Sequence, residues 1–311
     1  MKHAALVVLA LASTAAAQPL GDRTRAQLDA VADAVAPYRD FEVAKARGWK
    51  QFGGEDTPLM GEHWVQDGGP DYVAGDRFDF SRPSNLMYTD IGGKKVLTGV
   101  AFTVRLAPGD AVPEGFAGAA DRWHVHDFER AIGAALVDRP ILRWLANAWL
   151  DANYRSKGDD RGRIAMVHAW VTLPNPDGVF ADYNRTLPYL KLGLPARFAE
   201  GASIEAANGL DLVTPAGCKN ALEGGLWIAN VKRDAAKQLR NACADAAAHV
   251  REGVSSREPR RINAMAEHGW MMFEAARDKL LTPEQQGRIA AVTEHGGHDM
   301  MAADDGHMGH H

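Results

Sequence analysis

The sequence predicts an α+β fold in which a β-rich barrel or sandwich is followed by a helical C-terminal module and a disordered tail. Three observations support this prediction. Hydrophobic residues alternate with a period of two between residues 60 and 179, they follow helical spacing from 217 to 292, and residues 295–311 lack large apolar side chains. The expected segments are a signal peptide (1–17), an N-terminal helical segment (18–59), a β-rich domain (60–215), a helical module (216–294) and the tail (295–311).

The N-terminus has the pattern of a secretory signal peptide. Lys2 precedes a short apolar run at residues 4–12, and small residues at 15–17 supply a cleavage site after Ala17. An uncleaved anchor is the alternative. Since no other stretch has the roughly 20 apolar residues of a membrane-spanning helix, we expect a mature chain without a membrane span in the periplasm or outside the cell.

Composition excludes several classes of partner and chemistry. The chain has 311 residues, 46% of them hydrophobic, with a formal net charge of −5 and a pI near 6.2. This balance provides no basic surface for nucleic acid or anionic membranes. The sequence also lacks the short motifs of α/β-hydrolases, P-loop proteins and helical zinc proteases. It identifies no protein partner.

The individual elements follow from local patterns. Apolar residues spaced through 25–48, with Pro37 among them, predict one or two short helices that end at Gly48. Alternation over 96–106 predicts a strand. A stripe of Ile141, Leu145, Trp149 and Ala152 predicts a helix from Pro140 to Tyr154 that packs against the sheet. Residues 180–215 show neither period and are expected to be a connector.

The C-terminal module is predicted to contain long amphipathic helices. Thr282, Pro283 and Gln285 have the pattern of a helix start. Met265, His268 and Met272 have spacings of three and four and could form a copper site, but we interpret the two methionines as core residues because they share a stripe with Ile262 and Phe273.

The two cysteines, Cys218 and Cys243, are too few for a disulfide framework. In an oxidising compartment, a single pair is more often bridged than free. The two could meet if Gly224–Gly225 divides the segment into a hairpin, whereas on one straight helix they would lie about 37 Å apart.

A pair of histidines is the most specific chemical signal. His124 and His126 alternate within Trp123–His126, so on a strand both side chains share a face and can bind one ion. His63 and His168 are the other histidines of the β-rich segment, and four imidazoles could converge there. Three tryptophans (Trp64, Trp123, Trp170) would shape the surroundings, and three carboxylates are candidate supporting groups or replacement ligands (Glu62, Asp127, Glu129). The alternative is that His63 and His168 are ordinary buried histidines.

Residues 118–133 resemble the first cupin motif, in which a glycine precedes a His-x-His pair, an acidic ligand and a second glycine. Glu129 comes one residue earlier than in that motif, and no second cupin motif follows. The resemblance implies a metal-binding β fold, but likeness of fold does not establish function.

A wider stretch, residues 25–184, resembles a group of functionally uncharacterised secreted bacterial proteins. The shared segments are Gly61–Trp64, Arg82–Tyr88, His168–Trp170 and Asn175–Phe180. This resemblance implies a secreted β domain and no particular activity. The charged segment around His124, the helical module and the tail depart from the group's pattern.

The tail combines histidine with methionine. Imidazole suits copper, zinc and nickel, and thioether suits Cu(I), so the mixture favours copper, with zinc next. The tail residues that could bind metal are His295, His298, Met300, Met301, His307, Met308, His310 and His311. The alternative is that a polar, glycine-rich terminus has no ligand.

Three hypotheses for function follow. The first is an exported protein that binds copper or zinc, for buffering or resistance, through the histidines of the β domain and the tail. The second is a cupin-like metalloenzyme with an open coordination position and an unknown substrate. The third is a secreted structural or interaction module without metal. The sequence does not decide whether the protein is an enzyme.

Overall fold

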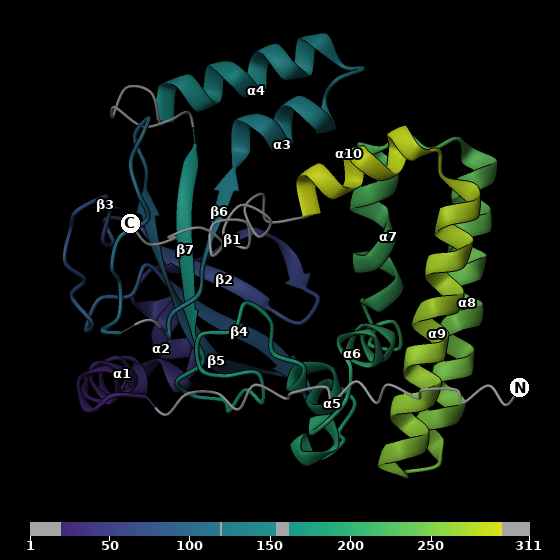
Figure 1. Ribbon diagram of the computed structural model, residues 1–311, viewed down its shortest axis with the longest axis horizontal. Coiled ribbons are helices and arrows are strands. Elements are labelled where there is room, and N and C mark those ends of the chain that lie inside the picture. The colour runs from purple at the N-terminus through teal and green to yellow at the C-terminus, as the bar shows by residue number, and fades with distance from the viewer. Residues whose placement is uncertain (1–19, 119, 154–161, 294–311) are drawn as a thin grey trace, which may run out of the picture.

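The computed structural model describes residues 20–118, 120–153 and 162–293 (Figure 1). The expected signal peptide and His/Met tail lie outside these residues. The described chain has a mixed α and β architecture, with a twisted sheet beside a group of long helices. No helix in the described part combines the length and the apolar character needed to cross a membrane.

The seven strands of the described chain form one open sheet with the order β1-β2-β4-β5-β7-β6. All pairs along this order are antiparallel, and the short β3 adds to β5 in parallel. The strands are β1 (Trp49–Thr57), β2 (Gly61–Gln66), β3 (Tyr72–Val73), β4 (Asn85–Ile91), β5 (Lys94–Arg105), β6 (Trp123–Asp127) and β7 (Arg163–Ala169).

The predicted barrel or sandwich is therefore wrong for the described residues. β1 and β6 are at the two ends of the order and do not pair with each other. Alternating hydrophobicity identifies strands and their faces, but it does not say whether a sheet closes or what covers it. Here helices and loops cover the sheet in place of further strands.

Ten helices of the described chain and two 3-10 turns surround or adjoin the sheet. They are α1 (Asp22–Val35), η1 (Ala36–Arg39), α2 (Phe41–Ala46), α3 (Phe128–Ala135), α4 (Pro140–Asn153), α5 (Thr186–Lys191), η3 (Ala196–Ala199), α6 (Ile204–Asp211), α7 (Gly217–Ile228), α8 (Arg233–Ser255), α9 (Pro259–Leu280) and α10 (Pro283–Thr293).

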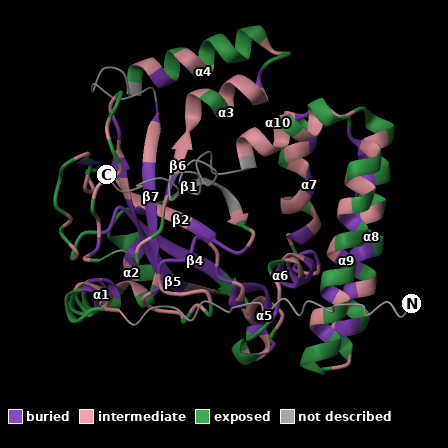
Figure 2. Cartoon of the chain, in the orientation of Figure 1, coloured by how far each residue is buried: buried purple, intermediate pink, exposed green. Residues whose placement is uncertain are grey.

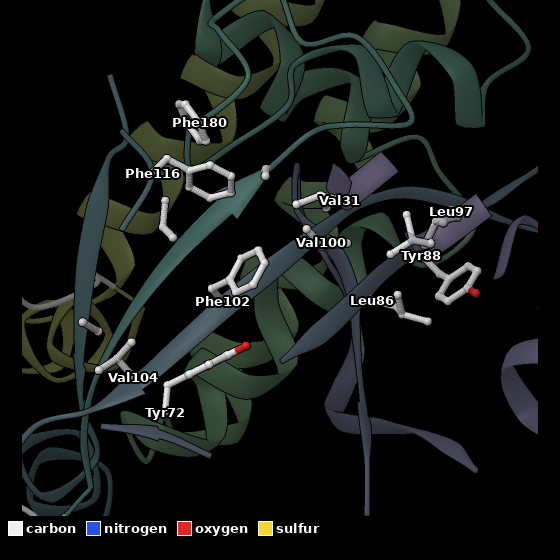
Figure 3. Close-up of a cluster of buried hydrophobic side chains, with 14 of the residues drawn as sticks. Val31, Tyr72, Leu86, Tyr88, Leu97, Val100, Phe102, Val104, Phe116 and Phe180 are labelled. Atoms are coloured by element: carbon white, nitrogen blue, oxygen red, sulfur yellow. The ribbon is translucent and has the colours of Figure 1, made fainter. Parts of the chain in front are cut away.

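The main hydrophobic core lies on one face of the sheet (Figure 3). α1 covers the strands there because its helical spacing brings Val31 and Val35 to the same side, and both are fully buried. Phe116 closes the core from a loop. The strand residues of this core include Leu86, Tyr88, Val100, Phe102, Val104, Ala165, Val167 and Ala169.

The entry segment forms the expected short helices, and Gly48 follows them with a positive φ of 83°. This conformation suits glycine, and it turns the chain into β1 at Trp49. The strand β1 was not expected in this segment. α5 and α6 were also missed, because they lie in the stretch interpreted as a connector.

α4 forms where the sequence predicts a helix, but its apolar stripe does not pack against the sheet. Ile141 is 74% exposed and Trp149 53% exposed, whereas Leu150 is fully buried. Figure 2 shows α4 as mostly exposed or intermediate. α4 contacts α3, which lies between it and the rest of the molecule in Figure 1. The expected packing is therefore wrong.

The helical module contains a disulfide between Cys218 and Cys243, whose Cα atoms are 5.9 Å apart. The reversal that brings them together is not at Gly224–Gly225, which stay within α7, but at the α7–α8 connection, where Asn230 has a positive φ. The predicted start of α10 is confirmed. The Thr282 hydroxyl accepts from the Gln285 amide, and the Gln285 side chain accepts from the Thr282 amide.

Candidate metal centre

Four histidines from three strands lie together on the sheet face opposite the main core. His63 comes from β2, His168 from β7, and both His124 and His126 from β6. The Nε2 atoms of His63 and His168 are 3.2 Å apart. The ring centroid of His124 lies 5.0 Å from that of His168 and 5.0 Å from that of His126. The structure thus brings together all four histidines that the sequence singles out in the β-rich segment.

Curvature of the sheet makes this cluster possible. β4 and β5 lie between β2 and β7, so His63 and His168 come from strands three spacings apart, about 14 Å in a flat sheet. Contact between their ring nitrogens requires the sheet to curl around the histidine face. A register shift in the β4–β5 pairing between Met87 and Tyr88 lies at the middle of this curve.

The floor of the cluster is apolar. Met87 is directly opposite His63, Ala101 opposite His168, and Met166 opposite His124 in their strand pairs. Because directly opposite residues share a face, these side chains lie beneath the rings. Met87, Ala101 and Met166 form a small buried cluster with Trp170 and Leu187. The site therefore excludes water from below.

Of the three tryptophans expected around the site, Trp170 is beside it, with its ring 6.0 Å from that of His168. Trp64 and Trp123 alternate with His63 and His124 along their strands, so they face the other side and pack against the main core. Their expected role at the site is wrong.

Asp182 supports two of the histidines. Its carboxylate is 3.1 Å from Nδ1 of His124, and its backbone carbonyl is 2.8 Å from Nδ1 of His168. With Nδ1–H donating in each case, the lone pair of each ring is on Nε2. One residue thus fixes the tautomer of two imidazoles. Asp182 itself is only 8% exposed.

The loop after β7 positions Asp182. The Trp170 indole donates to the Ala181 carbonyl at 2.6 Å, and Asn175 donates to the carbonyl of Tyr183 at 2.7 Å. Arg185 forms an ion pair with Asp177 across the base of the loop. Sequence reasoning missed Asp182 because it belongs to the segment interpreted as a connector, and no local pattern distinguishes this aspartate from others.

Burial lowers the pKa of two histidines of the cluster, His126 and His168. Desolvation, and then the neighbouring His63, lowers the pKa of His126 to about 4. Desolvation, followed by His124 and His63, places the pKa of His168 well below its ordinary value, although Asp182 opposes this shift. Neutral imidazole is the form that binds a metal.

Two of the three carboxylates proposed as supporting groups, Glu62 and Asp127, have other partners. Glu62 is on the opposite face of β2 from His63, where it accepts from the Trp64 indole and pairs with Lys95 at 2.5 Å. The Asp127 carboxylate caps α3 by accepting from the Arg130 amide at 2.8 Å. Glu129 lies in the first turn of α3, next to Phe128, whose ring stacks on His126. The prediction is wrong for Glu62, and Asp127 acts as a helix cap.

One side of the cluster opens to a pocket. His124 and His168 are buried, whereas His126 lines a cavity of about 140 Å³ between α3 and α10. Val292 of α10 lines this cavity and also a larger one of about 960 Å³, whose wall includes Met60, Tyr183 and Trp270. The cavity beside the histidines is thus lined by α3 and the end of α10.

In the described part of the chain, no three or more His, Cys, Asp or Glu side chains already have an arrangement that could hold a metal ion. The imidazoles are grouped, but the described contacts of their nitrogens join them to one another and to Asp182. Binding of an ion would replace the contact between His63 and His168 and turn the rings toward a common point.

Comparison with known protein families, with curated proteins and with solved structures finds no match for this chain. The two resemblances in the sequence therefore stay expectations based on short motifs. The function is argued below from the site alone.

Proposed function

We propose that this chain is a periplasmic or secreted protein that binds a transition metal, copper before zinc, for buffering or resistance. His63, His124, His126 and His168 are the proposed ligands. The observation that carries the proposal is their convergence on one curved face of the sheet, from segments separated by up to 105 residues. Burying polar rings costs free energy unless they have partners. An ion bound by all four rings would offset this cost.

The spacing of the rings supports a shared ion. Two imidazole nitrogens bound to one tetrahedral metal at about 2.0–2.1 Å lie about 3.3 Å apart. His63 and His168 have this separation without metal, at 3.2 Å. Asp182 supplies the carboxylate that commonly orients a metal-binding histidine.

The surroundings favour copper over harder ions. The donors are imidazoles, and the sulfurs of Met87 and Met166 belong to the floor. Soft ligands of this kind suit copper, and imidazole also suits zinc. The disulfide between Cys218 and Cys243 supports an oxidising compartment.

The tail is proposed to capture the ion. It continues directly from α10, whose Ala291 and Val292 line the same cavity as His126. The described part of α10 that precedes the tail therefore lies at the side of the cluster where His126 lines a cavity.

A metalloenzyme is the second candidate, and one observation favours it. His126 lines a cavity of about 140 Å³, and Val292 lines both this cavity and a larger one of about 960 Å³. An ion there with a vacant coordination position would face a space large enough for a small substrate. Two or three histidine ligands with exchangeable water would favour catalysis, and four would favour storage.

The test compares metal binding by the full chain and by a chain ending at Thr293, each with Cu(II) and Zn(II) at micromolar concentration. We expect the shorter chain to keep one ion at the buried site and the full chain to bind more. In the shorter chain, the H63Q/H168Q double variant should lose that ion, because glutamine cannot replace two imidazoles.

The matched control is E62Q. Glu62 is next to His63 in the same strand but faces the other side of the sheet, so this variant should keep the affinity. The proposal fails if both chains stay free of metal, or if H63Q/H168Q binds as tightly as E62Q.

A further inference from the structure

A second histidine pair lies far from the sheet, on the two longest helices. His249 of α8 and His268 of α9 face each other across the antiparallel hairpin. Nδ1 of His268 is 3.1 Å from Nε2 of His249, and the ring centroids are 4.8 Å apart at 80°. His268 is exposed and His249 is half-buried, so solvent reaches the pair.

Small residues hold the two helices close at this level. A Cβ atom at Gly269 would lie 2.4 Å from a methyl of Val250, and one at Gly253 would lie 2.8 Å from the Cβ of Met265. Because both glycines are in regular helix, these contacts show how tightly the backbones approach. They also fix the register in which His249 meets His268.

Two further donors lie one helical turn away on the same side. Asp245 is four residues before His249, and Met272 is four residues after His268. Since the helices run antiparallel, both steps lead in the same direction along the hairpin. Asp245 is exposed and Met272 is 39% exposed. The interpretation of Met272 as a core residue is therefore wrong, and its thioether is within reach of solvent.

We propose that His249 and His268 form a second, solvent-facing metal site, which takes Cu(II). Two imidazoles held at 3.1 Å match neighbouring positions around one ion, which are about 2.9 Å apart at a right angle and about 3.3 Å apart in a tetrahedron for bonds of about 2.0–2.1 Å. The Asp245 side chain is not yet gathered with the two rings, but after a rotamer change it and water would complete a tetragonal N,O set, the geometry that Cu(II) prefers. Among divalent ions, Cu(II) also has the highest intrinsic affinity for such donors.

This site is independent of the four-histidine cluster. No residue is shared, and the α8–α9 hairpin that carries the pair lies at the side of the molecule away from the sheet (Figure 1). It would bind an ion at the surface while the sheet cluster holds one inside, so the chain carries two folded sites of different access.

The test is Cu(II) titration of the full chain and of two double variants, H249Q/H268Q and H63Q/H168Q. We expect each double variant to lose one equivalent of bound Cu(II), and the two losses to add when the variants are combined. The H249Q/H268Q variant should keep its helical circular dichroism and melting temperature, because the substituted rings are at the surface. D245N should weaken the same equivalent without removing it.

A second measurement observes the rings directly. This measurement uses the H63Q/H168Q variant and Zn(II) as a diamagnetic probe. As one equivalent of Zn(II) is added, the imidazole nitrogen resonances of His249 and His268 should shift together. The proposal is overturned if H249Q/H268Q binds as many Cu(II) ions as the unmodified chain with the same affinities, or if the two resonances do not move. If H63Q/H168Q loses one equivalent of Cu(II) and H249Q/H268Q loses none, the site on the sheet is supported and the site on the helices is contradicted.

Discussion

Asp182 holds the histidine cluster through two different groups, its carboxylate and its backbone carbonyl. A substitution at position 182 changes the carboxylate and leaves the backbone carbonyl in place. It therefore removes the partner of His124, whereas His168 keeps its hydrogen bond to the main chain.

We expect D182A to lower metal affinity about 10-fold to 100-fold, because His124 loses the partner that orients its ring. D182N keeps an oxygen acceptor and loses the negative charge, so its effect should be smaller. Competition with a chelator of known affinity measures both. Equal affinity of D182A and the unmodified chain would show that Asp182 does not orient a ligand.

The low pKa of His126 predicts a pH dependence of the metal-free protein. In the unfolded chain this histidine takes up a proton near pH 6.5, whereas in the folded chain it does so only near pH 4. The unfolded state therefore binds more protons between these values, and stability falls as the pH drops from about 6.5 to about 4. His126 alone accounts for at most about 3 kcal/mol over this window.

Urea unfolding of the unmodified chain and of H126Q at several pH values measures this contribution. Glutamine does not titrate, so the difference in unfolding free energy between the two should change across the window and be constant above pH 7. A difference that is the same at pH 4.5 and pH 7 would contradict a buried, neutral His126.

At the residue scale, the sequence predicted the cluster but not its support. His124 and His126 were identified by alternation within one strand, which is a local property. His63 and His168 were candidates because the β segment has no other histidines. Their contact depends on sheet curvature, and the role of Asp182 depends on a loop that folds back over β7, so neither has a local signal.

At the scale of single elements, the α7–α8 hairpin combines a covalent link with a hydrophobic core, since Cys243 is buried in the cluster against which Cys218 packs. The disulfide closes a loop with a sequence separation of 25 residues. For such a loop, the entropy lost by the unfolded chain corresponds to about 3.5 kcal/mol.

The C218A/C243A double variant should therefore lose about 3.5 kcal/mol of unfolding free energy, measured by chemical denaturation. Alanine is chosen over serine because position 243 is fully buried, and serine would place a hydroxyl there. Reduction of the unmodified chain is the control and should give a similar loss. A loss below about 1 kcal/mol would show that the bridge contributes little to the folded state.

α4 has a strong apolar pattern in its sequence, but most of its large apolar side chains are exposed. Trp144 is 68% exposed. We expect W144S to change the unfolding free energy by less than about 0.5 kcal/mol, as for other surface positions. L150A is the buried control and should cost about 2–5 kcal/mol. Similar losses for both variants would mean that the Trp144 side is covered in solution.

The difference between the predicted and observed packing of α4 has a simple cause. Periodicity shows that a helix has an apolar face, and it does not show what lies against that face. The same limit explains the incorrect barrel, because strand alternation is equally compatible with an open sheet. The long helices of the C-terminal module and the start of α10, which depend on neighbouring residues, were predicted from the sequence, whereas the short helices α5 and α6 were missed.

At the scale of the whole molecule, a buried ion triad joins the sheet to the helices. Lys191 of α5 lies 2.9 Å from Asp56 of β1 and 3.3 Å from Asp211 of α6. Burial raises the pKa of Asp211 even beside the lysine, and the two carboxylates raise the pKa of Lys191 against its own desolvation. The triad is therefore sensitive to loss of its only cation.

We expect K191M to destabilise the protein by about 3–5 kcal/mol at pH 7, because two carboxylates are left close together and buried. The loss should shrink as the pH falls toward 5, since the raised pKa of Asp211 lets it take up a proton in the folded state. K191R keeps the charge and should cost less. Equal unfolding free energies for K191M and the unmodified chain would contradict this role.

The position of Val292 bears on how an ion would reach the metal site proposed above. His295 and His298 follow it by three and six residues, and Val292 lines the cavity of His126. Groups on so short a tether act at an effective concentration in the millimolar range, whatever the dilution of the ion outside. An ion held there would pass to the buried histidines in a first-order step within one molecule, and the rate constant of that step would not depend on protein concentration.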